Sequence, residues 1–175
     1  PKHFCMNDVL SYNTSIPSYG DHRPIWPKFG EYRYESKCDC DLDQHFPFYF
    51  RFVPPQRWLH NIEHGAVVML YHPCTHPVTV DKLRSLVTGC IRKHIITPYT
   101  NMSEERPLAL VAWGCVMTMS RVEEAKVVEF IRTRGLKGPE GTYPKEGQYT
   151  HQLQKLAEPP QGSDINDTTL CPNFV

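Results

Sequence analysis

The chain has 175 residues, with 19 lysines and arginines and 19 aspartates and glutamates, so its formal net charge is zero. This length allows one domain with a proper hydrophobic core and is too short for two, so we expect residues 1–175 to form a single domain. Basic runs and acidic tails are both absent, which argues against a nucleic-acid partner. The longest apolar stretches, 66–71 and 108–116, fall well short of the ~20 residues that a membrane helix needs.

Residues 1–57 are rich in Pro, Tyr, Phe and turn residues and show no 3.6-residue period. We expect an irregular N-terminal segment there with one or two short strands, one of them over 48–53. Residues 56–64 can form a short helix, because the preceding prolines suit its first turn and Gly65 suits a left-handed cap. The continuous apolar run 66–71 predicts a buried strand.

The clearest predicted helix spans 79–94, where apolar residues recur at three- and four-residue steps. Strands are predicted over 95–99 and 108–119, and a second amphipathic helix over 122–134. Gly, Pro and polar residues dominate 136–175, which predicts an extended C-terminal arm. The central order of strand, helix, strand, strand, helix predicts an α+β fold. In it, two main helices pack on one face of a mostly antiparallel sheet.

The seven cysteines are scattered along the chain and are not grouped in paired CxxC knuckles, which favours disulfides in an oxidising compartment over a zinc ribbon. N-glycosylation sequons begin at Asn13, Asn101 and Asn166, all in polar, turn-rich sequence. Together these features predict a glycoprotein that is secreted or a lumenal ectodomain. Pro1 cannot be a natural initiator, so we expect a mature or trimmed form.

Two disulfide pairings are predicted. Cys74 and Cys90 flank the start and the interior of the first long helix, and a bridge between them would close about 15 residues and contribute roughly 3 kcal/mol. A bridge from Cys5 to Cys171 would tie the two ends of the chain together. The odd number of cysteines leaves at least one thiol free, intermolecular or metal-bound.

The most informative stretch is HNIEHG at 60–65. His60 and His64 are four residues apart, a spacing that puts both rings on one face of a helix, and neutral imidazole is a common ligand for zinc and copper. His22, in a turn-rich segment, is the predicted third ligand. Glu63 can orient a ligand histidine by accepting its second N–H, or act as a catalytic general base beside a metal-bound water.

Copper is the expected metal, with zinc as the alternative. Cys115, Met117 and Met119 alternate along the predicted strand 108–119, so their side chains share one face. Soft sulfur ligands suit Cu(I), and Met117 could add to the histidine site. The simpler interpretation is a buried strand face on which Met and Cys are ordinary filling residues.

The sequence leaves enzymatic activity open, either redox chemistry at copper or hydrolysis at zinc. The order H-x-x-E-H also occurs in one class of metalloproteases, but the prolines before 56 and Gly65 leave room for only about two or three helical turns. The alternative function is a non-catalytic extracellular structural or interaction module, in which the histidines of 60–65 bond to backbone carbonyls.

Several short motifs occur in a fixed order: SIPSYG at 15–20, PPQRWLHNIEHG at 54–65, YHPC at 71–74, ITPY at 96–99 and LVAWG at 110–114. In this order they resemble a domain family of unassigned function found in bacterial exported proteins and animal ectodomains. The likeness covers roughly residues 12–135. It implies an extracellular domain whose natural form can carry a membrane anchor outside this chain, and it brings no established chemistry with it.

Overall fold

The computed structural model describes residues 2–3, 10–32, 53–141 and 145–174. The strand predicted over 48–53 lies outside these residues apart from its last position. In chain order the described elements are β1 (Gly30–Tyr32), α1 (Pro55–Glu63), β2 (Val67–Tyr71), α2 (Pro77–Cys90), β3 (His94–Pro98), β4 (Leu108–Ala112), β5 (Cys115–Met119), α3 (Glu124–Arg134) and β6 (Leu153–Leu156).

The strands form one sheet in the order β5-β4-β2-β3-β1-β6. Strands β2 and β3 are parallel and are joined by α2, and β1 is parallel to β3. The pairings β2–β4, β4–β5 and β1–β6 are antiparallel, so three of the five strand pairs run in opposite directions. The predicted α+β fold with a mostly antiparallel sheet is confirmed.

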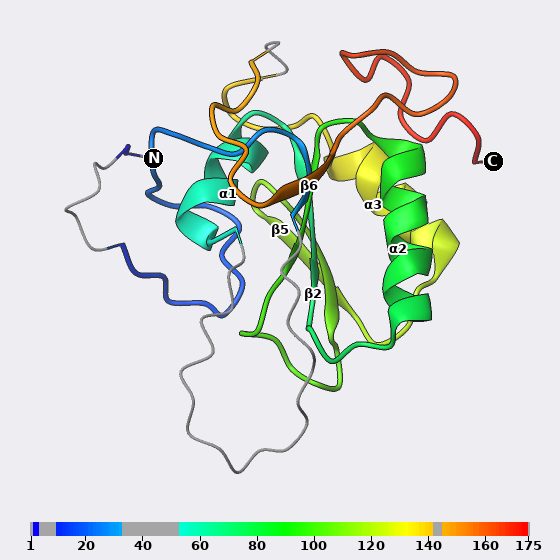
Figure 1. Cartoon of the computed structure of the whole chain (residues 1–175), viewed down its shortest axis with the longest axis horizontal. Helices are drawn as coiled ribbons and strands as arrows, with labels where there is room; N and C mark the ends of the chain where they lie inside the picture. Colours follow the sequence, from blue (N-terminus) through cyan, green and yellow to red (C-terminus); the bar gives the residue numbers. More distant parts are fainter. Residues whose placement is uncertain (1, 4–9, 33–52, 142–144, 175) are drawn as a thin grey trace.

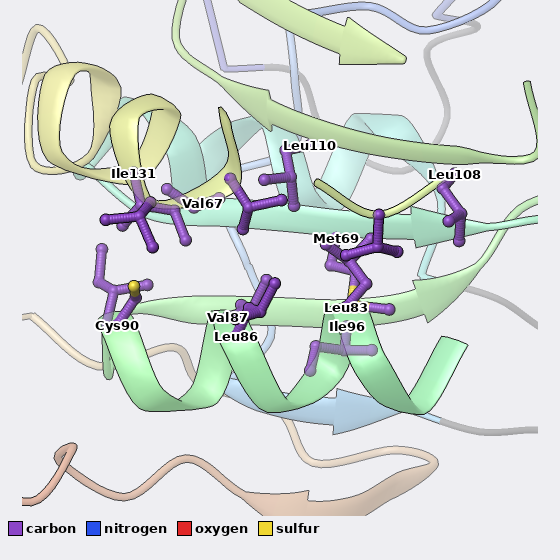
Figure 2. Packing of buried hydrophobic residues seen from close by; sticks show 14 of the residues in the cluster. Val67, Met69, Leu83, Leu86, Val87, Cys90, Ile96, Leu108, Leu110 and Ile131 are labelled. Carbon is purple, nitrogen blue, oxygen red and sulfur yellow. The ribbon is translucent and has the colours of Figure 1, made fainter. Parts of the chain in front are cut away.

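Helices cover both faces of the sheet (Figure 1). The two long helices, α2 and α3, lie on one face, where Leu83, Val87 and Ile131 pack against alternate residues of the strands, Met69 and Leu110 among them (Figure 2). Helix α1 and the N-terminal segment cover the opposite face. The prediction of two main helices on one face is therefore confirmed, and the second face belongs to the segment that carries the HNIEHG motif.

On the α1 face, the neighbouring strand residues point the other way. Val68 and Ile95 pack there against Trp58, Leu59 and Ile62 of α1, and all five side chains are completely buried. Burial of large apolar side chains contributes about 1.5–3 kcal/mol each, relative to leaving them exposed. Helix α1 has only nine residues, too short to be stable alone, so its position is fixed by this packing.

Two strands differ from the sequence predictions. The single strand predicted over 108–119 is a hairpin, in which Trp113 and Gly114 form a two-residue turn between β4 and β5. Gly114 has φ of 71°, a left-handed conformation that glycine adopts at no steric cost. The second difference is β6, which forms within the predicted C-terminal arm and pairs with β1.

The disulfide also differs from both predicted pairings. Cys90, at the end of α2, is bonded to Cys171, so neither the Cys74–Cys90 bridge nor the Cys5–Cys171 bridge is correct. The reason is the length of α2: it has 14 residues, about 21 Å, and Cys74 precedes its first turn while Cys90 ends its last. The C-terminal arm instead returns to this end of the helix, where the Cys171 N–H donates to the Cys90 carbonyl at 2.8 Å.

Candidate metal centre

Helix α1 positions two side chains of the site on one face. His60 and Glu63 are three residues apart, which places them next to each other on the last turn of the helix. The His60 Nδ1–H donates to the backbone carbonyl of Arg23 at 2.8 Å, and both His60 and Glu63 are buried. The backbone carbonyls at a helix C-terminus give it partial negative charge, which favours a cation at this end.

His22 comes from the loop before β1, which lies against α1. Its backbone is held by the N–H of the neighbouring Arg23, which donates to the Gln56 carbonyl at 2.8 Å. Its ring is held by Nδ1–H, which donates to the Gly20 carbonyl at 2.9 Å. Gly20 has φ of 125°, which a side chain would strain. The His22 ring is completely buried and faces Glu63.

His3 completes the group, although it is far from the other residues in sequence. Residues His3 and His22 form an isolated parallel bridge, in which the His22 N–H donates to the Lys2 carbonyl at 3.1 Å. The Lys2 N–H donates in turn to Asp21 Oδ1 at 2.9 Å. The His3 ring stacks on the His60 ring, with centroids 4.8 Å apart and planes 4° from parallel.

The four side chains present ligand atoms that lie within 4.8 Å of one another. His22 Nε2 is 2.9 Å from Glu63 Oε2 and 3.0 Å from His3 Nε2, and His3 Nε2 is 3.4 Å from Glu63 Oε2. A tetrahedral ion with bonds of about 2.0–2.1 Å holds its ligand atoms about 3.3 Å apart. The group is therefore compact enough to hold a metal ion.

The hydrogen bonds fix where the ring protons lie. A carbonyl oxygen only accepts, so Nδ1 of His22 and Nδ1 of His60 both carry hydrogen, and the lone pair of each neutral ring is on Nε2. Burial lowers the pKa of His60 to about 3, against the smaller opposing effect of its bond to Arg23, so this ring is neutral at physiological pH. The cluster thus brings ring lone pairs toward a carboxylate, which is also an acceptor.

The segment after α3 holds the end of α1 in place. The Leu136 N–H donates to the Gly65 carbonyl at 2.8 Å, and the Glu140 N–H donates to the Glu63 carbonyl at 3.2 Å. Gly138 approaches so closely that a Cβ there would lie 2.0 Å from the Glu63 carbonyl oxygen. Gly65 has φ of 86°, as its predicted role as a left-handed cap requires. The orientation of Glu63 therefore depends on residues more than 70 positions later.

His64 is not part of the group. It is the C-cap residue of α1, and its backbone N–H donates to the His60 carbonyl at 3.3 Å. Its Nε2 lies 3.2 Å from Glu140 Oε2, and its ring stacks on Trp26 at 5.0 Å and on His60 at 5.1 Å. The prediction of His64 as a ligand is corrected: His64 packs beside the four clustered residues, and its Nε2 contacts Glu140 instead of joining them.

Met117 lies on the other side of the sheet. It pairs with Leu110 across the β4–β5 ladder and packs with Leu110 against the cluster under α2 and α3. The histidine group is on the α1 face. The prediction that Met117 joins the histidines is therefore wrong. Of the alternating sulfur residues, Met119 is buried in this core and Met117 packs partly buried against it, whereas Cys115 is half-buried.

Glu63 was predicted to orient a ligand histidine or to act as a general base. Its carboxylate oxygen instead lies among the candidate ligand atoms themselves. His3 was absent from the predicted site, because a single histidine in an aperiodic N-terminal segment carries no spacing signal.

The sequon residues Asn13, Asn101 and Asn166 are all exposed, and their glycosylation stays a prediction. No helix in the described part of the chain combines the length and apolarity that crossing a membrane requires.

The comparisons with known proteins agree with the motif resemblance. A family model described as "Protein of unknown function (DUF3105)" matches residues 3–44 and 41–147, a span that includes all four clustered residues. Tumor protein p53-inducible protein 13 of Mus musculus and of Rattus norvegicus are each 30% identical over 67 residues, 38% of this chain. The aligned part spans 17% of the length of these relatives. No solved structure matches the chain.

Proposed function

The chain belongs to the DUF3105 family, and because that family has no assigned function, we propose one from the site itself: the domain binds one transition-metal ion. The ligands are His3, His22, His60 and Glu63. Zinc is the favoured ion and copper(II) the second.

The observation that carries the proposal is the convergence of acceptors. His22 Nε2 bears a lone pair when the ring is neutral, because its Nδ1–H is already donated to Gly20, and it lies 2.9 Å from the acceptor oxygen of Glu63. Two acceptors at this distance repel unless a cation lies between them. A metal ion supplies that charge, and the backbone carbonyls behind His22 and His60 are the partners that usually orient metal-binding histidines.

The chemistry of the ligands favours zinc over copper. Three imidazole nitrogens and one carboxylate oxygen suit zinc, and also copper(II), whereas Cu(I) is selected by soft sulfur ligands. Met117, the sulfur ligand expected from the sequence, packs on the other face of the sheet. Four protein ligands are the usual number for a structural zinc ion, and three of the ligand atoms here, on His3, His22 and Glu63, are 2.9–3.4 Å apart.

A metal-free structural module is the alternative, and one distance favours it too. The 2.9 Å separation between His22 Nε2 and Glu63 Oε2 is also the length of a charge-assisted hydrogen bond. In that case a proton on His22 takes the place of the ion, and the group only ties the N-terminal segment to α1. The two functions differ in whether purified protein retains a metal.

Elemental analysis separates them. Protein produced without a histidine tag, exposed to zinc and dialysed, is expected to contain one zinc per chain, and His22→Ala and His60→Ala to contain none. His64→Gln is the matched control, because His64 is equally buried and stacks on His60 but points to Glu140. Metal-free wild-type protein, or zinc retained equally by every variant, would contradict the proposal.

The location of the domain is part of the same proposal: an ectodomain or secreted domain of the secretory pathway. The disulfide between Cys90 and Cys171 and the exposure of all three sequon residues support it. A shift in electrophoretic mobility after peptide N-glycosidase treatment of the protein from animal cells tests it, and an unchanged mobility in the triple Asn→Gln variant is the control.

A further inference from the structure

We infer that His3 is an exchangeable ligand, and that the ion binds a small anion or an imidazole-like nitrogen donor from solvent at the position of the His3 ring. This inference rests on the proposed metal site and adds a ligand-binding function to it. It follows from an asymmetry among the four side chains, in exposure and in attachment.

The asymmetry in exposure is large. The His3 side chain is 38% exposed, whereas that of His22 is 0% and that of Glu63 is 3%. His60 is also buried, at 5%. Water and small solutes therefore reach the centre on the His3 side, and the other three residues form its buried base.

The four side chains also differ in how firmly they are held, and His3 is again the exception. His60 and Glu63 are on a packed helix, and the rings of His22 and His60 are each held by an Nδ1–H bond to a backbone carbonyl. Within the described residues, the contacts of the His3 ring are those of its Nε2 with His22 and Glu63 and its ring contacts with His22 and His60. Among the residues that the structure describes, no backbone carbonyl holds the His3 Nδ1, in contrast to the Nδ1 atoms of the two buried histidines.

Departure of His3 leaves two histidines and one carboxylate around the ion. Sites with this residual set keep open coordination positions, at which a metal ion binds an external ligand. The ring that departs leaves a space bounded by the His60 ring, on which His3 now stacks at 4.8 Å with the planes 4° apart. An external aromatic nitrogen donor of imidazole size can occupy the same position and stack in the same way, and a small anion such as azide is favoured by the positive ion.

Cobalt(II) substitution makes this testable, because its visible absorption reports changes in coordination. Wild-type protein, His3→Ala and His22→Ala would each be titrated with cobalt, with and without added imidazole or azide, and folding would be monitored by circular dichroism. His3→Ala is expected to bind one cobalt more weakly than wild type and to show a saturable spectral change with either solute. Imidazole at ten times its own Kd is expected to restore about tenfold of the cobalt affinity.

The matched control is His22→Ala, which removes an imidazole of the same size from a fully buried position. It is expected to bind no cobalt, and imidazole is not expected to restore binding. Loss of cobalt from folded His3→Ala as complete as that from His22→Ala, or no response of His3→Ala to either solute, would overturn the inference while leaving the metal site in place. Failure of wild-type protein to bind cobalt or zinc would overturn the proposed function and this inference with it.

Discussion

At the scale of the residue, the site depends on one negative charge among neutral rings. Glu63 is the only acid of the four clustered residues, and its oxygen is within 3.4 Å of two of the three histidines. A carboxylate in a buried site binds a divalent cation far more strongly than an uncharged amide of the same shape, because the surroundings screen charge poorly.

Glu63→Gln keeps the shape of the side chain and removes its charge. We expect zinc affinity to fall at least about tenfold, equivalent to about 1.4 kcal/mol, as measured by competition with a chelator of known affinity. Glu140→Gln is the control, since its carboxylate contacts His64 and is outside the group. Equal zinc affinities in the two variants would show that Glu63 is not a ligand.

His94 gives a prediction for metal-free protein. It is fully buried in β3, its Nδ1–H donates to the Ile91 carbonyl at 2.7 Å, and burial lowers its pKa to about 4. The charges of Glu31, which raises this pKa, and of Arg92 and Lys155, which lower it, have smaller effects. Between about pH 4 and 6.5 the unfolded chain binds a proton that folded His94 does not.

The free energy of unfolding should therefore rise with pH over this window and lose that dependence above it. Urea unfolding in the presence of a chelator at several pH values measures the slope. His94→Asn, which retains an N–H donor, is expected to reduce the slope and not to abolish it, because burial also lowers the pKa of His60, to about 3. Identical slopes for His94→Asn and wild-type protein would mean that His94 is not the group responsible.

The sequence predicts the residues of the site only in part, for reasons that are local. His60 and Glu63 follow from helical spacing, and His22 from its turn-rich surroundings. His64 has the right spacing and its ring stacks on His60, but its Nε2 lies 3.2 Å from Glu140 Oε2, a tertiary contact that helical spacing does not predict. His3 reaches the group through an isolated bridge to His22. This is a tertiary contact, which sequence periodicity does not predict.

At the scale of the element, the end of α1 is fixed by the segment that follows α3. Gly138 lies against the Glu63 carbonyl with no room for a Cβ, and Glu140 and Leu136 donate to the same end of the helix. A change in this distant segment should therefore reach the metal site through the backbone of Glu63, without any contact to the ion.

Gly138→Ala is expected to destabilise the fold by about 1–3 kcal/mol, the usual cost of overpacking a tight contact, and to weaken zinc binding by displacing Glu63. Thermal unfolding and chelator competition measure the two effects. Lys137→Ala, at the exposed neighbouring position, should change neither. A variant that loses stability but keeps full zinc affinity would show that this segment does not position Glu63.

Most elements are predictable from periodicity, and the exceptions have clear causes. The helices α2 and α3 and the strands β2 and β3 follow their hydrophobic patterns, and α1 follows from the prolines before it and Gly65 after it. The β4–β5 turn is missed because Trp113 and Gly114 interrupt an apolar run that otherwise reads as one strand. Strand β6 is missed because its four residues are mostly exposed and it is stabilised by pairing with β1, more than 120 residues earlier.

At the scale of the whole molecule, the disulfide and the metal site lie on opposite faces of the sheet. Cys90 and Cys171 belong to the core under α2 and α3, whereas the histidines lie on the α1 side. The bridge joins residues separated by 81 positions. In the chain-entropy model, closing a loop of this length lowers the conformational entropy of the unfolded chain and so stabilises the fold by about 4–5 kcal/mol.

The double variant Cys90→Ala/Cys171→Ala should therefore lose several kcal/mol of unfolding free energy in urea and still bind one zinc per chain under conditions where it stays folded. The control is Cys115→Ser. Cys115 lies on β5 and forms no disulfide, so this variant should have nearly the same unfolding free energy as wild-type protein. Stability unchanged in the double variant would mean that the bridge does not constrain the chain.

The central claim is that one ion joins residues from the N-terminus, the loop after it and α1. A crystal structure of zinc-treated protein, with anomalous data at the zinc edge, tests it most directly. We expect one peak about 2.0–2.2 Å from the Nε2 atoms of His3, His22 and His60 and from Glu63 Oε2. An empty cluster with His22 still hydrogen-bonded to Glu63, or zinc found only elsewhere on the molecule, would contradict it.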